Sequence, residues 1–425
     1  MDTLRRRIGR FFGVGLGVLA REGGRLTARP LGELLAVSSL ALIAVGLLAF
    51  RTELLSTGHS LFAEPGWDHH AYIAMARDNP FDFHVAPFGW RVGLPALAGA
   101  LPFGLQTSFF LLTFLAVTAM LVVLYYMLAA AGYGRQLALV GFGFLLTLGW
   151  ATKFALQDFW LPDGVAFLVV TLALLCVLRK QPMLFAVVVL VGVLVKEAVF
   201  FVVPLYYTLH AKRPIEPRLA LTTALVALPA ILALLVLRLA IPARNEDLVY
   251  VATLAPHLQS FREFIPSYSY YELLRDIGYH HRLHDYQLDT WLLYTTGTWT
   301  VPVLTFAVIG ALRTPVLALR LSPFLVLVYA QLLFAVNIER LLVLGFPAVL
   351  WLAVEGARHV CHRLEMSPAW ILPLPPVLFL FQFEHPATIP VRFEAETFVF
   401  LGWLALVITL APVWRARADA RSARM

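Results

Sequence analysis

The sequence predicts an all-α integral membrane protein with about twelve transmembrane helices, several of them short or re-entrant. Of its 425 residues, 60% are hydrophobic and only 14% are charged, and the mean hydropathy is +0.78. A soluble domain has roughly 45–50% apolar and about 25% charged residues, so this chain is expected to lie in a bilayer. The composition argues against a soluble enzyme or a disordered chain. Two cysteines cannot form a disulfide framework or a four-cysteine metal site.

The apolar runs divide the chain into a basic arm, one membrane domain and a basic tail. Residues 1–30 hold a short apolar stretch among arginines with no clear cleavage site, which favours a cytoplasmic arm over a signal peptide. The membrane domain is expected to cover 31–414, with its first span at 31–50, and 415–425 form a cytoplasmic tail. Further apolar runs lie at 107–131, 137–151, 164–178, 183–195, 198–209, 219–240, 290–311, 321–336, 341–354, 367–382 and 397–414.

The region 183–209 is expected to cross outward and return. Basic residues flank it on both sides, at Arg179 and at Lys212, and basic flanks belong on the cytoplasmic side. The chain must therefore turn at Lys196 and Glu197. A run of this length reaches roughly 20 Å as a helix, less than the ~30 Å hydrocarbon core, so the turn should lie in a recess.

Two predicted outer loops, 51–106 and 241–289, are too long to be simple turns. With both termini inside, the acids and most histidines gather on the outer side, while Lys and Arg concentrate inside. The second loop repeats apolar residues at steps of three and four, as expected of interfacial helices on the headgroups. These residues are Phe261, Phe264, Tyr268, Tyr271, Leu274 and Ile277.

The first outer loop holds the most informative stretch, from Gly66 to Arg77. A helix here would present Asp68 at its first turn, where the helix dipole favours a carboxylate. Asp68 could accept a proton from an acceptor hydroxyl, or it could simply cap the helix. His69, His70 and Tyr72 are candidate substrate-binding residues beside it.

Acidic residues also precede the apolar run 164–178. The pattern favours helix capping for Asp163, which does not prevent it from facing a cavity, and ordinary loop solvation for Asp158. Lys196 and Glu197 differ, because charge at membrane depth is costly and usually faces a cavity or a partner. We therefore favour a functional role for this pair over mutual neutralisation.

Two arginines are candidate phosphate ligands. Arg340, next to Glu339, begins a short return span, and its guanidinium offers planar, permanently charged donors. A surface salt bridge of Glu339 is the structural alternative. Arg91, beside Trp90, has the same ambiguity.

Metal-ligand spacing occurs once in the sequence. Residues 280–285 read HHxxHD, which would place His280 and His284 on one helical face, and His69 and His70 could complete a site. Histidines are common in loops near headgroups, so no cofactor is expected to be required, and a divalent metal remains the alternative.

The order of these motifs resembles that of polytopic GT-C fold glycosyltransferases. Over most of the chain, an N-terminal span and an outer loop opening with an acid are followed by further acidic and basic motifs. These are Trp67-Asp68, Ala86–Arg91, Leu161-Pro162-Asp163, Val195-Lys196-Glu197 and Glu339-Arg340 with Phe346-Pro347. The resemblance implies transfer of a sugar from a polyprenyl-phosphate lipid to an acceptor on the non-cytoplasmic side. Many relatives carry paired acids where this chain has Asp68 followed by two histidines.

The resemblance also implies roles for single residues. Asp68 matches the first-loop catalytic acid and Asp163 a second outer-loop acid, while Lys196 and Arg340 occupy positions suited to the lipid phosphate. Because a lipid phosphate is already a good leaving group, we expect Asp68 to act as base on the acceptor, with Arg91 assisting the phosphate ligands. A single inverting displacement follows. A lipid, glycan or short peptide acceptor is expected, since only a basic tail follows the last span.

Other functions remain open at this point. A lipid or solute transporter or flippase usually carries charges near the midplane, whereas several runs here have none. A polysaccharide polymerase or ligase would use similar lipid-linked sugars. A purely structural role would not explain why charged residues stand at Lys196 and Glu197 inside the membrane domain.

The expected location is a bacterial cytoplasmic membrane. The chain is rich in Arg, Ala and Leu and poor in Lys, which is typical of a GC-rich prokaryotic genome and puts the outer face on the periplasmic or extracellular side. The net charge of +7 is expected to be divided unequally between the two sides of the membrane, so it does not predict a nucleic-acid partner.

Overall fold

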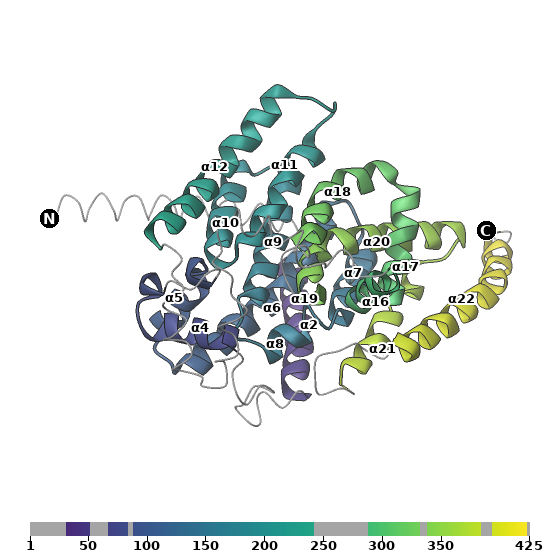
Figure 1. Ribbon diagram of the computed structural model, residues 1–425. Coiled ribbons are helices and arrows are strands. Elements are labelled where there is room, and N and C mark those ends of the chain that lie inside the picture. Colours follow the sequence, from purple (N-terminus) through teal and green to yellow (C-terminus); the bar gives the residue numbers. More distant parts are fainter. Residues whose placement is uncertain are drawn as a thin grey trace.

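The computed structural model describes six ranges of the chain, and every regular element in them is a helix (Figure 1). The ranges are 31–51, 67–83, 88–241, 288–331, 338–383 and 393–422. The predicted all-helical class is confirmed for this part of the chain, which contains no strand.

Four helical segments in these ranges are long and apolar enough to cross a membrane. They are α2 (Leu31–Arg51), α6 (Leu105–Ala130), α12 (Pro217–Ala240) and the segment Glu339–Arg363. A bent pair, α16 (Leu288–Trp299) and α17 (Val301–Arg313), makes five if it is counted as one span. The predicted number of about twelve is therefore not confirmed.

The remaining apolar runs form shorter helices, below the length of a complete span. These short helices are α7 (Arg135–Thr147), α9 (Asp163–Leu178), α10 (Pro182–Val195), α11 (Val203–His210), α18 (Pro315–Ala330), η7 (Pro368–Trp370), α21 (Leu374–Leu380) and η8 (Phe381–Phe383). The last helix, α22 (Phe393–Ser422), is longer, but its apolar part covers only Glu396–Leu410. Short helices in a bilayer must be completed or shielded by their neighbours, because every backbone polar group needs a partner there.

Two predicted runs have different bounds in the structure. The apolar run 290–311 was counted as one span, and in the structure it is a bent pair in which the chain turns by 99° between α16 and α17. Thr300 at the break has a φ of 59°, and Pro302, in the first turn of α17, has no amide proton to donate to the preceding helix. The run 341–354 is longer than expected, because α19 (Ile338–Leu342), η6 (Val343–Gly345) and α20 (Phe346–Arg363) continue it.

The extension of α20 past its apolar part has a local cause. Glu355 is buried, and its carboxylate accepts a hydrogen bond from the Tyr133 hydroxyl at 2.7 Å. Arg358 on the next turn also binds Glu355, at 2.5 Å. Because these partners satisfy the carboxylate, the helix can continue into the polar part of the sequence.

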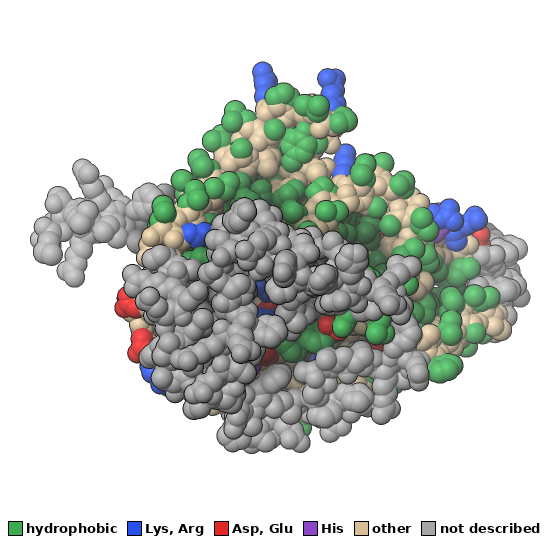
Figure 2. Space-filling view, viewed as in Figure 1, with side chains coloured by type: hydrophobic (Ala, Val, Ile, Leu, Met, Phe, Trp, Pro, Cys, Tyr) green, Lys and Arg blue, Asp and Glu red, His purple; other side chains and the backbone are tan. Residues whose placement is uncertain are grey.

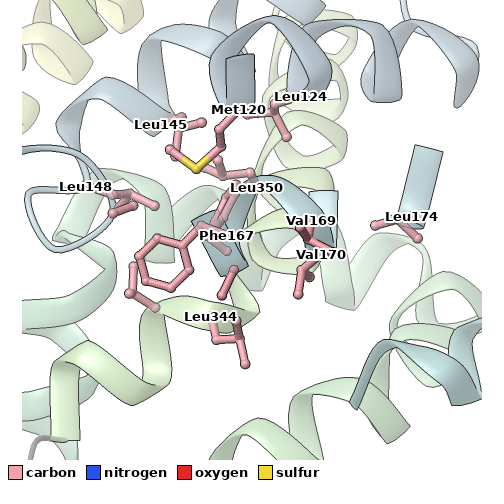
Figure 3. Packing of buried hydrophobic residues seen from close by; sticks show 14 of the residues in the cluster. Met120, Leu124, Leu145, Leu148, Phe167, Val169, Val170, Leu174, Leu344 and Leu350 are labelled. Carbon is pink, nitrogen blue, oxygen red and sulfur yellow. The ribbon is translucent and has the colours of Figure 1, made fainter. Parts of the chain in front are cut away.

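The central core is formed by α6, α7, α9 and α20. Figure 3 shows Met120 and Leu124 of α6, Leu145 at the end of α7, Phe167 of α9 and Leu350 of α20 converging on one apolar cluster. All five side chains are buried. The cluster therefore packs around α9, the helix that begins at Asp163.

Helices α17 and α20 approach each other at two glycines. A Cβ atom added to Gly310 would collide with the carbonyl of Leu352, and one added to Gly356 would collide with the carbonyl of Phe306. Small residues allow such close backbone contact between helices in membranes, where van der Waals packing drives association. The position of α17 against α20 therefore depends on these glycines.

We expect Gly356→Val to destabilise the protein by about 1–3 kcal/mol or more, because the side chain must push α17 away. The measurement is the thermal unfolding midpoint in detergent. Gly402→Val on α22 is the matched control, since a Cβ there meets nothing within 4 Å. Equal midpoints for Gly356→Val and Gly402→Val would contradict the prediction.

The chain turns at Lys196, as the charge pattern predicts. Lys196 has extended backbone angles, φ −158° and ψ 126°, after α10 ends at Val195. The short helix η3 (Glu197–Val202) follows and leads into α11. The Val199 side chain packs back onto Gly192, so the chain reverses direction here. Lys196 is thereby placed at the end of a short helical pair.

The predicted first outer loop, 51–106, contains several short helices. They are α4 (Trp67–Arg77), η1 (Pro80–Asp82), η2 (Phe88–Trp90) and α5 (Gly93–Ala100), and α8 (Lys153–Gln157) lies in the connection between α7 and α9. Most of the second predicted loop, residues 242–287, lies outside the described ranges, so its interfacial helices remain a prediction.

Exposed basic residues gather at the opposite end from the Lys196 turn. Figure 2 shows Lys and Arg side chains projecting from the connection between α11 and α12, where Lys212, Arg213 and Arg218 are exposed. Arg313 and Arg363, at the ends of α17 and α20, are also exposed. The expected orientation, with this basic end in the cytoplasm, remains a prediction.

Candidate functional site

A buried ion pair system centres on Asp163. This residue is 1% exposed and begins α9. Its Oδ1 lies 2.5 Å from Lys196 Nζ, and its Oδ2 lies 2.9 Å from Arg340 Nε and Nη2. Both carboxylate oxygens are thus taken up by cations, one from the α10–η3 turn and one from α19. The expected capping role of Asp163 is wrong: no side chain caps α9, and Pro162 occupies the N-cap position.

Glu197 pairs with Arg91 and not with its neighbour Lys196. The guanidinium of Arg91 donates from Nε at 2.8 Å and from Nη2 at 2.5 Å to the two carboxylate oxygens. Arg91 Nη1 also donates to the Tyr72 hydroxyl at 3.1 Å. This bidentate contact fixes the loop after η2 against the Lys196 turn. Mutual neutralisation of Lys196 and Glu197 is therefore excluded as their main contact.

Asp158 is buried and contacts His69. The expected solvation of Asp158 in a loop is wrong, because the residue is 6% exposed and its Oδ1 lies against His69 Nε2. His69 is also buried, within α4. The contact joins the connection before α9 to the first outer loop.

These pairs form one continuous cluster, which we call the ionic network. Asp158 interacts electrostatically with both Arg340 and Asp163, and Lys196 interacts with Arg91. The ionic network therefore consists of His69, Tyr72, Arg91, Asp158, Asp163, Lys196, Glu197 and Arg340. Six of the eight members, all except His69 and Tyr72, are acidic or basic side chains.

Burial and pairing act in opposite directions on the acids of the ionic network. Burial disfavours the charge of Glu197, but Arg91 outweighs this effect and lowers the pKa of Glu197 to about 2. Burial likewise opposes the charge of Arg91, yet Glu197 and Tyr72 hold the Arg91 pKa well above its ordinary value. At Asp158 burial dominates, and the pKa is raised despite the hydrogen bond to His69. Burial thus outweighs pairing at Asp158, whereas pairing with Arg91 outweighs burial at Glu197.

Three predicted site residues, Asp68, His70 and Glu339, are not among the members of the ionic network. Asp68 and His70 belong to α4, on either side of His69, but their side chains lie outside the described part of the structure. Glu339 is half-buried beside Arg340, and none of the ion pairs described here includes it. The backbone of Asp68 nevertheless lies one residue from a member of the network.

The metal prediction has no support in the described ranges. The run 280–285 lies outside them, and the described residues contain no group of three or more His, Cys, Asp or Glu side chains that could hold a metal ion. The partner of His69 is Asp158, a pair that the sequence pattern did not suggest.

Sequence reasoning missed two cations near this end of the molecule. Lys153 in α8 is buried, and burial lowers its pKa to about 8. Arg238, in the last turn of α12, lies over the ring of Trp90. A lysine directly after the run 137–151 and an arginine near the end of 219–240 were the available signals, because charges inside or beside apolar runs need a reason.

No protein-family model matches this chain, and no characterised protein matches it. The class of protein therefore rests on the fold: the described ranges are all-helical, several of their helices are long and apolar enough to span a membrane, and they hold a buried ionic network.

We expect Asp163→Asn to destabilise the folded protein by about 3–5 kcal/mol, because it leaves two buried cations without their shared counter-charge. The thermal midpoint in detergent measures this change. Asp78→Asn, at an exposed position directly after α4, serves as control. An unchanged midpoint for Asp163→Asn would show that the triad carries no net stability.

The Arg91–Glu197 pair predicts a pH dependence. The pKa of Glu197 is about 2 in the folded state against an ordinary value of 4.5, so its stabilising effect is complete above about pH 4.5 and is lost as the pH falls toward 2. The difference in thermal midpoint between wild type and Glu197→Gln should stay constant from pH 7 to 5 and shrink below. We expect a modest effect, because 32% of the side chain is exposed to screening solvent. A difference that grows on acidification would refute the assignment.

Proposed function

We propose that this protein is a membrane glycosyltransferase of the GT-C type. It takes a sugar from a polyprenyl-phosphate or related lipid-phosphate donor and transfers it to a lipid, glycan or short peptide acceptor on the non-cytoplasmic face. The observation that carries the proposal is the ionic network: Lys196, Arg340 and Arg91 are held by carboxylates at the outer ends of apolar helices. The order of the sequence motifs provides the second support.

The network supplies what a lipid-phosphate leaving group needs. As the bond between the sugar C1 and the phosphate oxygen breaks, the electron pair stays on the phosphate, and fixed cations stabilise the developing charge. The pairing with Asp163 and Glu197 holds the cations in place before substrate arrives, so little reorganisation is needed. In this proposal Lys196 and Arg340 are the phosphate ligands, and Arg91 assists them.

The acceptor oxygen forms the new bond to C1 and gives its proton to a base. Asp68 is the base in our proposal, because α4 places it beside His69 and because Asp163 is committed to two cations. Asp163 is then a positioning residue. A single displacement of this kind inverts the configuration at C1, and it needs no metal.

The position of the charges favours group transfer over transport. Asp163 starts α9, Lys196 directly follows α10, and Arg340 lies in α19 before the long apolar part of α20. Transporters place their binding sites near the bilayer midplane, at breaks inside spans. The same ends of the helices lie opposite the exposed basic residues, which supports an active site on the periplasmic or extracellular side of a bacterial cytoplasmic membrane.

The test is sugar transfer by the purified protein in liposomes that contain polyprenyl-phosphate-linked sugars. We expect Asp68→Asn to lower the transfer rate about 10²-fold or more, as loss of a general base does, and Asp78→Asn to leave it unchanged. Linkage analysis should show an inverted anomeric configuration. Full activity of the Asp68→Asn variant would contradict the assignment of Asp68 as the base. Movement of lipid across the bilayer without formation of product would favour a flippase.

A comparison of donors addresses the polymerase and ligase alternative. A glycosyltransferase of the proposed type uses a lipid carrying a single sugar. A strong preference for a lipid carrying an oligosaccharide would favour a polysaccharide polymerase or ligase.

A further inference from the structure

The connection between α11 and α12 is a turn whose backbone is held in a defined shape. The carboxylate Oε1 of Glu216 accepts hydrogen bonds from the backbone amides of Lys212 at 2.5 Å and Arg213 at 2.8 Å. The Tyr207 hydroxyl donates to the carbonyl of Pro214 at 2.9 Å and accepts from the amide of Glu216 at 2.8 Å. These contacts tie both ends of the turn together. The turn can therefore present its exposed side chains in constant positions.

Helix α18 fixes the turn relative to the rest of the molecule. Thr208, in α11, donates from Oγ1 to the carbonyl of Arg320 in α18 at 2.6 Å. Arg320 Nη2 in turn donates to the carbonyl of Ala211 at 3.1 Å. Because the guanidinium of Arg320 binds the first residue after α11, the turn is attached to α18 as well as to its own two helices.

The turn carries an excess of positive charge. Lys212 and Arg213 lie within it, Arg218 lies in the first turn of α12, and all three are exposed. Within the described ranges, none of these three side chains forms an ion pair. The acid of the turn, Glu216, is half-buried and directs its Oε1 at two backbone amides. Three cations are thus left facing outward with no acid assigned to them.

An apolar surface begins directly beside these cations. Ile215, between Arg213 and Arg218 in the sequence, is 81% exposed, and Leu221 and Leu225 are exposed further along α12. Only 17% of the most apolar stretch of α12 is buried, the smallest share among the four long apolar helices. Hydrophobic side chains surround the projecting Lys and Arg side chains in Figure 2. A helix of this kind places its exposed apolar part among acyl chains and the adjoining cations among headgroups.

We infer that Lys212, Arg213 and Arg218 form a binding surface for the headgroups of anionic phospholipids, with Ile215 inserted beside the acyl chains. Clusters of Lys and Arg immediately next to a span attract anionic lipids, and exposed apolar side chains strengthen such binding. A soluble polyanion would use the cations but not Ile215 or the leucines of α12, so the apolar surface favours a lipid. The inference does not use the ionic network and is independent of the proposed glycosyltransfer.

The experiment measures lipid binding by the full-length protein in detergent. Phosphatidylglycerol is titrated into the micelles, and the rise in thermal midpoint gives the affinity. We expect the combined variant Lys212→Gln, Arg213→Gln and Arg218→Gln to bind about tenfold or more weakly, because all three cations are lost. The combined variant Lys212→Arg, Arg213→Lys and Arg218→Lys keeps the charges and should bind as the wild type does. Midpoints without lipid establish that each variant is folded.

Single variants separate the turn from basic residues in general. Arg218→Gln should weaken binding several-fold, whereas Arg77→Gln, an exposed position in the last turn of α4, is the matched control and should have no effect. Ile215→Ser should also weaken binding, because it removes the inserted apolar side chain while keeping every charge.

Four outcomes would overturn the inference. The first two are wild-type affinity in the combined Gln variant and an equal loss in Arg77→Gln and Arg218→Gln. The third is an equal rise in midpoint with zwitterionic phosphatidylcholine or with inorganic phosphate, which would mean a general effect of lipid or of anions. The fourth is unchanged binding by Ile215→Ser, which would favour a soluble acidic partner over a lipid.

Discussion

The contact of Asp163 with Lys196 and Arg340 is the interaction on which the arrangement of the ionic network depends. It joins three segments that are far apart in the chain: the start of α9, the turn after α10 and the start of the segment Glu339–Arg363. In surroundings of low dielectric each of these charges would be costly alone, and together they satisfy one another. The turn between α10 and η3 can therefore place a lysine, Lys196, inside the protein.

The other contacts of the ionic network extend this constraint to the first outer loop. Arg91 binds Glu197 and Tyr72, and His69 contacts Asp158, so α4 and the loop after η2 are both tied to the Lys196 turn. Packing supports the arrangement from below, since the apolar cluster of α6, α7, α9 and α20 fixes the helices whose ends carry the charges. The result is a set of charges whose positions are fixed before any substrate binds. Such an arrangement suits chemistry in which negative charge develops on a leaving group.

Charge also distinguishes the two ends of the molecule. Several exposed Lys and Arg residues lie at the α11–α12 connection, whereas most acids and cations of the network are buried at the other end. An exposed basic residue needs only water or lipid headgroups around it, so its position can be predicted from the sequence pattern alone. Buried charges need specific partners. Helix α12 runs between the two ends, from the exposed Arg218 to Arg238, which stacks on Trp90 next to Arg91.

The amino-acid sequence by itself determined the helical class, the turn at Lys196 and most of the residues that meet in the ionic network, because apolar runs and charges beside them can be read without coordinates. It could not give the partners. Asp163 looked like a helix cap and Asp158 like a solvated loop residue, since local patterns do not show which distant cation lies opposite a carboxylate. The break at Thr300, the close approach at Gly310 and Gly356, and the pairing of Glu197 with Arg91 were likewise decided by tertiary structure. These features depend on how helices far apart in the chain pack together, and periodicity within one segment carries no information about that packing.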